Sequence, residues 1–133
     1  MTTTPHHGLI LVIEDNPLNL ELVRDILTVS GYQVLAANRA ELGIDLAKEH
    51  GPDLVIMDIS LPGMDGLTAT RRLRGIPTTS KIPILALTAS AMRGDERRVL
   101  AAGCDSYISK PFDIDVLLHE IEQLLAARKT SES

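Results

Sequence analysis

The stretch Pro52-Asp53-Leu54-Val55-Ile56-Met57-Asp58 decides the fold. Its middle is an unbroken apolar run that ends on a carboxylate, and Gly51 and Pro52 mark the turn before it. An apolar run without alternating polar residues is typical of a parallel strand that is covered on both faces of its sheet. We therefore predict a buried parallel strand over Asp53–Met57, with Asp58 at its carboxyl end.

Four further short apolar runs predict strands on either side of this one, over Leu9–Ile13, Gln33–Ala36, Ile82–Leu87 and Ser106–Ile108. Segments with helical periodicity separate or follow the strands, over Pro17–Ser30, Ala40–His50, Leu67–Arg74, Met92–Ala102 and Asp113–Ala127. Strict alternation of strand and helix favours an α/β fold with a doubly wound five-stranded parallel sheet and helices on both faces.

Two of these helices carry clear signals at their ends. In the first, Asn16 is placed to cap the helix, Pro17 occupies its first position and Gly31 follows its end. We expect it to bury one apolar face, made of Leu22, Ile26 and Val29. The last helix should be capped by Asp113, and its buried stripe should contain Ile114, Leu117, Leu118, Ile121, Leu124 and Leu125.

The composition restricts the class of protein. The chain has 133 residues, 44% hydrophobic and 23% charged, which fits one folded domain. Its formal net charge of -5 argues against a nucleic-acid-binding domain. Cys104 is the single cysteine, so an internal disulfide is excluded. No apolar stretch is long enough to span a membrane and no signal peptide precedes the first strand, so we expect a cytoplasmic protein.

Polar side chains stand at four of the five predicted strand ends: Glu14 and Asp15, Asp58, Thr88 and Lys110. Each alone is ordinary, since an acidic pair after a strand is usually a helix cap or a solvated loop. Together they gather at the carboxyl edge of the sheet, where ligands bind in such folds. Three converging carboxylates repel one another, and Mg²⁺ is the cation that suits them. A lysine and a hydroxyl beside them suit a phosphoryl group, and an aspartate can be the nucleophile that accepts it.

Five blocks of the sequence carry a family pattern, in order: residues 11–16, 52–58, 61–66, 82–89 and 103–112. With these blocks, the chain resembles receiver domains of two-component response regulators over residues 9–126. The resemblance implies a flavodoxin-like fold with strand order 2-1-3-4-5. It also implies a receiver domain over residues 9–127, between a flexible N-terminus at 1–8 and a disordered tail at 128–133.

The resemblance further implies a metal site and a phosphate acceptor. Asp58 would accept a phosphoryl group from a phosphohistidine. Asp15, Asp58 and the backbone carbonyl of Ser60 would bind Mg²⁺ directly, and Glu14 would act on the metal through water. Glu14 stands where many members of the family have a second aspartate.

A second set of residues would contact the phosphoryl group or respond to it. Lys110 and Thr88 would contact its oxygens, while the small Ala89 would leave it accessible. Thr88 and Tyr107 would form the switch, and the peptide bond from Lys110 to Pro111 would be cis. Ser60 and Ser90 occupy positions that the family uses to set the rate of dephosphorylation.

The expected function is that of a single-domain response regulator or phosphorelay receiver, which catalyses only its own phosphotransfer and autodephosphorylation. Its partners would be a histidine kinase or histidine phosphotransfer protein and a downstream target protein. The target would dock on the face formed by Met92–Ala102, the strand around Tyr107 and the helix from Asp113. The alternative is a receiver domain cut from a hybrid histidine kinase; the Met1 start and the short tails favour the stand-alone protein.

Two other classes fit less well. An aspartyl phosphohydrolase would need a carboxylate two residues after its nucleophile, and Ser60 is there instead. A nucleotide-binding module should carry a glycine-rich or Ser/Thr-rich loop after the first strand, but the sequence there is Glu14-Asp15-Asn16-Pro17.

Overall fold

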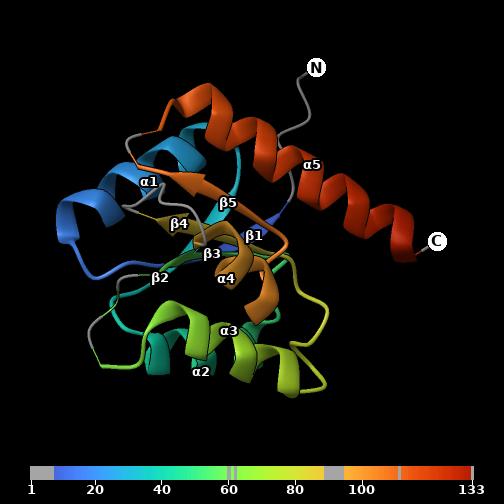
Figure 1. The fold of residues 1–133 in the computed structure, drawn as a ribbon. Coiled ribbons are helices and arrows are strands. Elements are labelled where there is room, and N and C mark those ends of the chain that lie inside the picture. The colour runs from blue at the N-terminus through green and yellow to red at the C-terminus, as the bar shows by residue number, and fades with distance from the viewer. Residues whose placement is uncertain (1–7, 60, 62, 89–94, 111, 133) are drawn as a thin grey trace.

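A computed structural model of the chain describes residues 8–59, 61, 63–88, 95–110 and 112–132. In these residues strands and helices alternate (Figure 1): β1 Leu9–Ile13, α1 Pro17–Val29, β2 Gln33–Ala37, α2 Ala40–His50, β3 Leu54–Asp58, α3 Gly66–Gly75, β4 Ile84–Thr88, α4 Asp95–Ala102, β5 Ser106–Ser109 and α5 Ile114–Glu132. All neighbouring strands pair in parallel, and the order is β2-β1-β3-β4-β5. The predicted fold class and strand order are confirmed.

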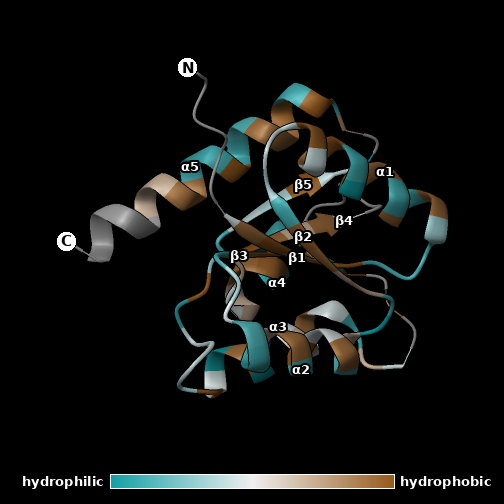
Figure 2. Cartoon of the chain, turned by 180° about the vertical axis from the view of Figure 1, so that it is seen from behind, coloured by the Kyte–Doolittle hydropathy of each residue, from teal (hydrophilic) through white to brown (hydrophobic). Residues whose placement is uncertain are grey.

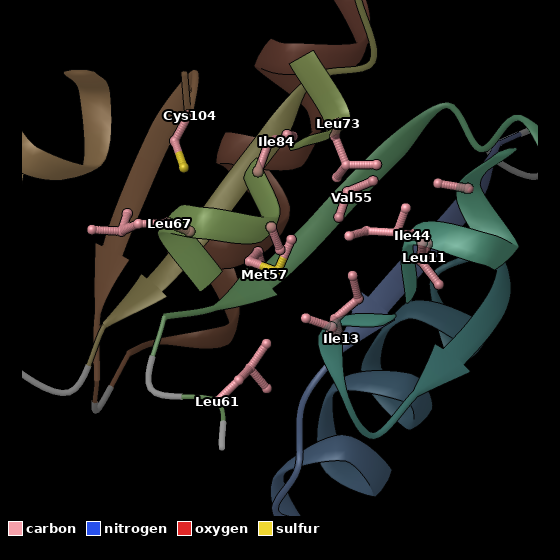
Figure 3. Packing of buried hydrophobic residues seen from close by; sticks show 14 of the residues in the cluster. Leu11, Ile13, Ile44, Val55, Met57, Leu61, Leu67, Leu73, Ile84 and Cys104 are labelled. Carbon is pink, nitrogen blue, oxygen red and sulfur yellow. The ribbon is translucent and has the colours of Figure 1, made fainter. Parts of the chain in front are cut away.

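The sheet is the middle of three layers, with helices on both faces. Side chains of each strand therefore alternate between two hydrophobic cores, one on each face. On β1, Leu11 and Ile13 pack with α2, α3 and α4 (Figure 3), whereas Ile10 and Val12 pack with α1 and α5. The strands form the apolar centre of the molecule in Figure 2, and the helices around them show both polar and apolar residues. Every residue of β3 and β4 is buried, as the apolar runs predicted.

The ends of some elements differ from the predicted ones for local reasons. β3 starts one residue later than predicted, at Leu54. Asp53 directly precedes the strand, and the Asp53 carboxylate accepts a hydrogen bond from the Leu9 N–H (2.8 Å). β4 starts at Ile84 because Pro83 has no N–H to donate to the ladder. α3 begins at Gly66, capped by the Asp65 carboxylate.

The predicted inner face of α1 is wrong in part. Leu22 and Val29 are 53% and 88% exposed, while Val23 and Leu27 are buried. Ile26, also assigned to that face, is partly buried. Apolar residues lie on two neighbouring stripes of this helix, and the periodicity of the sequence does not say which stripe meets the sheet.

The last helix is longer than predicted. α5 continues to Glu132 instead of ending at Ala127, because residues 128–132 contain no glycine or proline that would stop it. Its buried stripe is confirmed at its centre by Leu117 and Ile121, whereas Ile114 is 51% exposed. Among the helices of the described residues, none is both long and apolar enough to cross a membrane.

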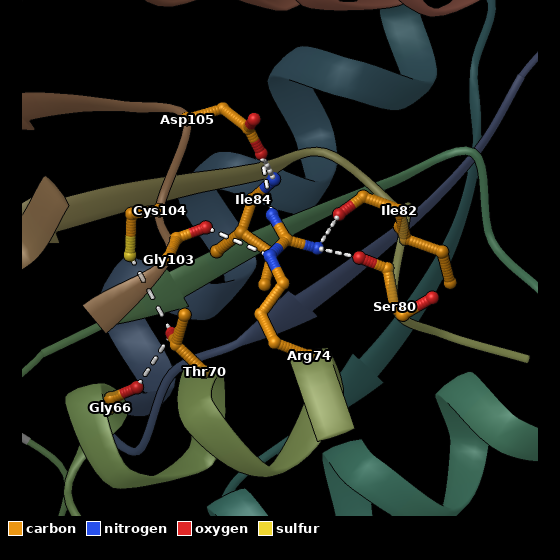
Figure 4. A network of polar contacts seen from close by, with 9 residues as sticks. All are labelled: Gly66, Thr70, Arg74, Ser80, Ile82, Ile84, Gly103, Cys104 and Asp105. Atoms are coloured by element: carbon orange, nitrogen blue, oxygen red, sulfur yellow. Dashed lines mark hydrogen bonds and ion pairs between the residues drawn. The ribbon is translucent and has the colours of Figure 1, made fainter. Parts of the chain in front are cut away.

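Arg74, near the end of α3, makes several hydrogen bonds at the edge of the sheet opposite the polar strand ends (Figure 4). Its guanidinium donates to the backbone carbonyls of Gly103 (2.9 Å), Ser80 (3.0 Å) and Ile82 (2.6 Å), and to the Asp105 carboxylate (2.7 Å). The same Asp105 oxygen accepts the N–H of the first residue of β4 (2.8 Å). One side chain thus joins α3 to the loops that precede β4 and β5.

Candidate functional site

The strand order reverses between β1 and β3, and the acidic residues lie where these two strands end. Carboxylate oxygens of Glu14, Asp15 and Asp58 all lie within 4.8 Å of one another. Glu14 and Asp58 are buried, with 1% and 4% exposure, and Asp15 is exposed. The expected convergence at the carboxyl edge is therefore present, and its exposed member leaves the cluster open to solvent.

Glu14 is held in place by hydrogen bonds to both of its carboxylate oxygens. Oε2 accepts the Asn16 N–H (3.1 Å), and Oε1 accepts the Lys110 ammonium (3.0 Å). Burial raises the pKa of Glu14 above its ordinary value of 4.5, and the neighbouring Asp58 raises it further. The hydrogen bonds from Asn16 and Lys110 oppose this rise without cancelling it. The charged form of Glu14 is therefore less favourable in the folded protein than in water.

Lys110 brings a positive charge to these carboxylates. Its Nζ lies 3.0 Å from Glu14 Oε1 and 3.5 Å from Asp58 Oδ2. Its backbone N–H donates to the carbonyl of Thr88 (2.7 Å), which fixes the end of β5 beside the end of β4. Thr88 is 5% exposed. Because all these residues follow strands of one sheet, the sheet itself sets their spacing.

The cluster has a net negative charge, since one ammonium faces three carboxylates. A hard divalent cation with oxygen ligands would offset this charge, and the exposed Asp15 leaves it a route of entry. The donor set contains neither sulfur nor imidazole, which favours Mg²⁺ over zinc or copper. The residues present therefore fit the metal that the sequence predicted.

The expected site residues fall into three sets. Glu14, Asp15, Asp58 and Lys110 lie together, and Thr88 ends the neighbouring strand. Tyr107 is half-buried on β5, where partial burial and then Glu96 of α4 raise the pKa of its phenol. The remaining expectations, on Ser60, Ala89, Ser90 and the Lys110–Pro111 bond, lie outside the described residues.

The sequence did not predict a largely apolar pocket of about 440 Å³ beside the cluster. Glu14 and Lys110 of the cluster line it, together with Asn19, Leu22, Val23, Leu87 and Phe112. The periodicity of the sequence predicts Leu22 on the buried face of α1, so no sequence signal places it at the site. The pocket gives the acidic cluster an apolar rim.

Sequence comparison identifies a protein family that matches most of this chain. The family profile of the response regulator receiver domain matches residues 10–122. The chain belongs to this family. A curated relative, the polar-differentiation response regulator DivK of Brucella anthropi, is 41% identical over 116 residues, which cover 87% of this chain and 94% of the relative. The chain is thus a receiver domain of the response-regulator type, a component of two-component signalling.

Solved structures of receiver domains have the same fold. The receiver domain of a sensor histidine kinase from Pseudomonas aeruginosa, solved with a magnesium ion in its active-site cleft, matches with a TM-score of 0.85 at 33% identity, over 91% of this chain and 99% of that one. The receiver domain of a histidine kinase from Syntrophus aciditrophicus matches with a TM-score of 0.84 at 34% identity, over 90% and 91%. Stand-alone regulators and kinase-borne receivers are therefore both similar to this chain.

The raised pKa of Glu14 predicts a pH dependence of stability. Without Mg²⁺, the folded protein holds a proton on Glu14 more tightly than the unfolded chain does. The free energy of unfolding should therefore fall as the pH rises from 4.5 through the raised pKa, and stay low above it. Glu14→Gln should remove this part of the slope. Urea unfolding at several pH values in EDTA measures it, with Glu21→Gln, an exposed site on α1, as the control. Equal slopes for wild type and Glu14→Gln would contradict the prediction.

Proposed function

We propose that this receiver domain accepts a phosphoryl group on Asp58 from a phosphohistidine, with Mg²⁺ as the cofactor. The observation that supports this most is the group of three carboxylates within 4.8 Å, with Lys110 Nζ 3.5 Å from Asp58 Oδ2. A structural salt bridge would need one carboxylate per cation. The excess of negative charge at an accessible strand end is what a metal and phosphate site requires.

In the proposed reaction, an Asp58 oxygen attacks the phosphorus of the phosphohistidine. The P–O bond forms as the P–N bond breaks, and the freed imidazole nitrogen keeps the electron pair and is protonated from solvent. Lys110 is placed to stabilise the oxygens of the phosphoryl group during transfer. Asp15 and Asp58 would hold Mg²⁺, which supplies positive charge to the phosphoryl oxygens, and Glu14 would orient its water.

A small phosphodonor tests the acceptor chemistry without a partner protein. With acetyl phosphate and Mg²⁺, the chain should gain one phosphoryl group, and with EDTA it should gain none. A generic phosphomonoester should not be turned over, because an aspartyl phosphohydrolase carries its general acid two residues after the nucleophile, and Ser60 stands at that position of this sequence. Steady turnover of such an ester would favour the phosphohydrolase class instead.

The output should be a change of the face made by α4, β5 and α5. Thr88 ends β4 and Tyr107 lies half-buried on the adjacent β5, so movement of one residue toward a phosphoryl group would open space for the other. A target protein that binds this face in one state only would read the change. The hydrogen bond from Ser106 Oγ to Glu120 (2.6 Å) joins β5 to α5, so the two elements should respond together.

This switch predicts a defined pattern of amide shifts. On phosphorylation, backbone amides of Asp95–Ala102, Ser106–Ser109 and the first turns of α5 should shift in two-dimensional NMR spectra. Amides of α2 should shift little and serve as the internal reference, because α2 packs against β1 and β2, away from β5. The proposed output face is wrong if the shifts stay confined to the strand ends around Asp58.

The phosphodonor is proposed to be a histidine kinase or a histidine phosphotransfer protein, in the cytoplasm. The apolar rim beside the cluster supports a protein donor, because Leu22 lines that pocket and is 53% exposed, and Leu18 of the same helix is 75% exposed. Such a partner would bury these side chains while its phosphohistidine reaches Asp58. The same chemistry serves a stand-alone regulator and a receiver carried by a kinase.

The apolar rim predicts that one substitution slows phosphoryl transfer from a protein donor and leaves the rate with a small-molecule donor unchanged. Leu22→Lys should slow transfer from a phosphohistidine protein by about tenfold, the usual effect of losing one apolar interface contact. Its rate with acetyl phosphate should not change. Val29→Lys, on the same helix and 88% exposed, is the matched control and should behave as wild type with both donors. Equal slowing with both donors would show damage to the site and not to docking.

A further inference from the structure

The first residue of α3 is unusually close to the backbone of the proposed acceptor. A Cβ built on Gly66 would lie 2.6 Å from the carbonyl oxygen of Asp58, 2.8 Å from the Cα of Ile59 and 3.1 Å from the Cγ of Met57. Contacts below 3.0 Å do not occur for real Cβ atoms, and two of these three partners are backbone atoms. The φ of Gly66 is not positive, so this glycine is required for space and not for an unusual conformation.

One hydrogen bond joins the start of α3 to the loop that follows β3, and a second lies within α3. The Gly66 N–H donates to the Ile59 carbonyl (3.1 Å). The Gly66 carbonyl accepts the hydroxyl of Thr70 (2.8 Å), and that hydroxyl lies 3.5 Å from the sulfur of Cys104 (Figure 4). Both polar groups of the Gly66 backbone are therefore engaged, one of them with the residue that follows Asp58.

A side chain at position 66 would have to displace either the helix or the strand end. The helix is firmly held: Leu67, Ala69 and Leu73 are at most 5% exposed in the core (Figure 3 labels Leu67 and Leu73), and Asp65 caps its first turn. At its far end Arg74 binds two loops. The peptide after Asp58 lies at the end of β3, where the Ile59 N–H still donates to the Leu87 carbonyl (3.1 Å), and we expect this strand end to yield before the packed helix does.

We propose that Gly66 is a positioning residue for the reaction: by lacking a side chain, it lets α3 fix the backbone that carries the Asp58 carboxylate. The inference rests on the proposed function of Asp58 and extends it to a residue that touches neither metal nor phosphate. A shift of a few tenths of an ångström in this backbone would move the carboxylate relative to Asp15 and Lys110. Misplacement of reacting groups by about 1 Å costs about 100-fold in rate.

Gly66→Ala tests the proposal against two controls on the same helix. Leu73→Ala removes a core side chain far from the strand ends and should lower stability without touching the site. Gly75→Ala places its Cβ in open space and should be silent. For each variant, urea unfolding gives the stability, calorimetry gives the Mg²⁺ dissociation constant, and initial rates with acetyl phosphate at saturating Mg²⁺ give the transfer step.

We expect Gly66→Ala to weaken Mg²⁺ binding at least about threefold and to slow phosphorylation at least about tenfold, while Leu73→Ala changes neither by more than about twofold. Equal effects of the two variants would overturn the proposal, because the loss would then follow stability alone. If wild type takes up no phosphate, the proposed function fails, and the Mg²⁺ affinities still decide the role of Gly66. If Gly66→Ala does not fold, Thr70→Val decides: a loss of Mg²⁺ affinity of about threefold or more supports the positioning role, and a change no larger than that of Leu73→Ala overturns it.

Discussion

Lys110→Met is expected to slow phosphorylation by acetyl phosphate by about 100- to 1000-fold, the usual cost of removing one donor that stabilises a developing negative charge. Its ammonium lies 3.5 Å from Asp58 Oδ2 and 3.0 Å from Glu14 Oε1. Methionine keeps the apolar stem and removes the charge. The variant would also leave Glu14 and Asp58 without their cation, so Mg²⁺ should stabilise it against unfolding more than it stabilises wild type.

The measurement is the initial rate of phosphate uptake at saturating Mg²⁺, on variants whose circular dichroism matches wild type. Lys81→Met is the matched control, because Lys81 is exposed and lies before β4, away from the carboxyl edge. Lys110→Arg keeps the charge but changes its shape, and we expect a rate between those of wild type and Lys110→Met. A Lys110→Met rate within about tenfold of wild type would contradict the proposed role of this lysine.

Arg74→Met is expected to lower the free energy of unfolding by about 2–4 kcal/mol, more than any exposed charge substitution on the same helix. The change removes hydrogen bonds to three backbone carbonyls and leaves Asp105 without its ion pair. The Arg74 and Asp105 side chains are 23% and 43% exposed, so solvent screens the ion pair, and most of the loss should come from the carbonyls.

Urea unfolding measures this loss, with Arg72→Met as the control because Arg72 is exposed on the same helix. Arg74→Lys should recover part of the stability, since an ammonium cannot reach four acceptors as the planar guanidinium does. Mg²⁺ affinity should stay close to that of wild type in both variants, because these bonds lie at the opposite edge of the sheet. Equal stability of Arg74→Met and Arg72→Met would refute the structural role of this network.

The polar residues of the site could be predicted because they follow buried strands directly. A parallel sheet brings all its carboxyl ends to one edge, so the positions of Glu14, Asp58 and Lys110 in the sequence already imply proximity in space. Fold class and strand order were predicted for a related reason: unbroken apolar runs such as Leu54–Met57 require cover on both faces, and the quoted family blocks imply the order.

Packing details were not predictable because they depend on how elements meet. Leu22 and Val23 are adjacent apolar residues, and only the placement of α1 on the sheet decides that Val23 is buried and Leu22 lines the pocket. The partners of Arg74 are carbonyls of loops distant in sequence, which no pattern encodes. Gly66 left one signal, a glycine directly after the capping Asp65 where a better helix former would be usual, but the sequence does not show what lies against it.

The central claim is that Asp58 accepts a phosphoryl group in a Mg²⁺-dependent reaction. Intact-mass analysis after incubation with acetyl phosphate tests it most directly, on wild type, Asp58→Asn and Asp45→Asn, an exposed aspartate of α2. We predict a gain of one phosphoryl group in wild type and Asp45→Asn with Mg²⁺, and no gain in Asp58→Asn or in EDTA. A folded wild type that gains no phosphate, or an Asp58→Asn variant that gains it as fast as wild type, would contradict the claim.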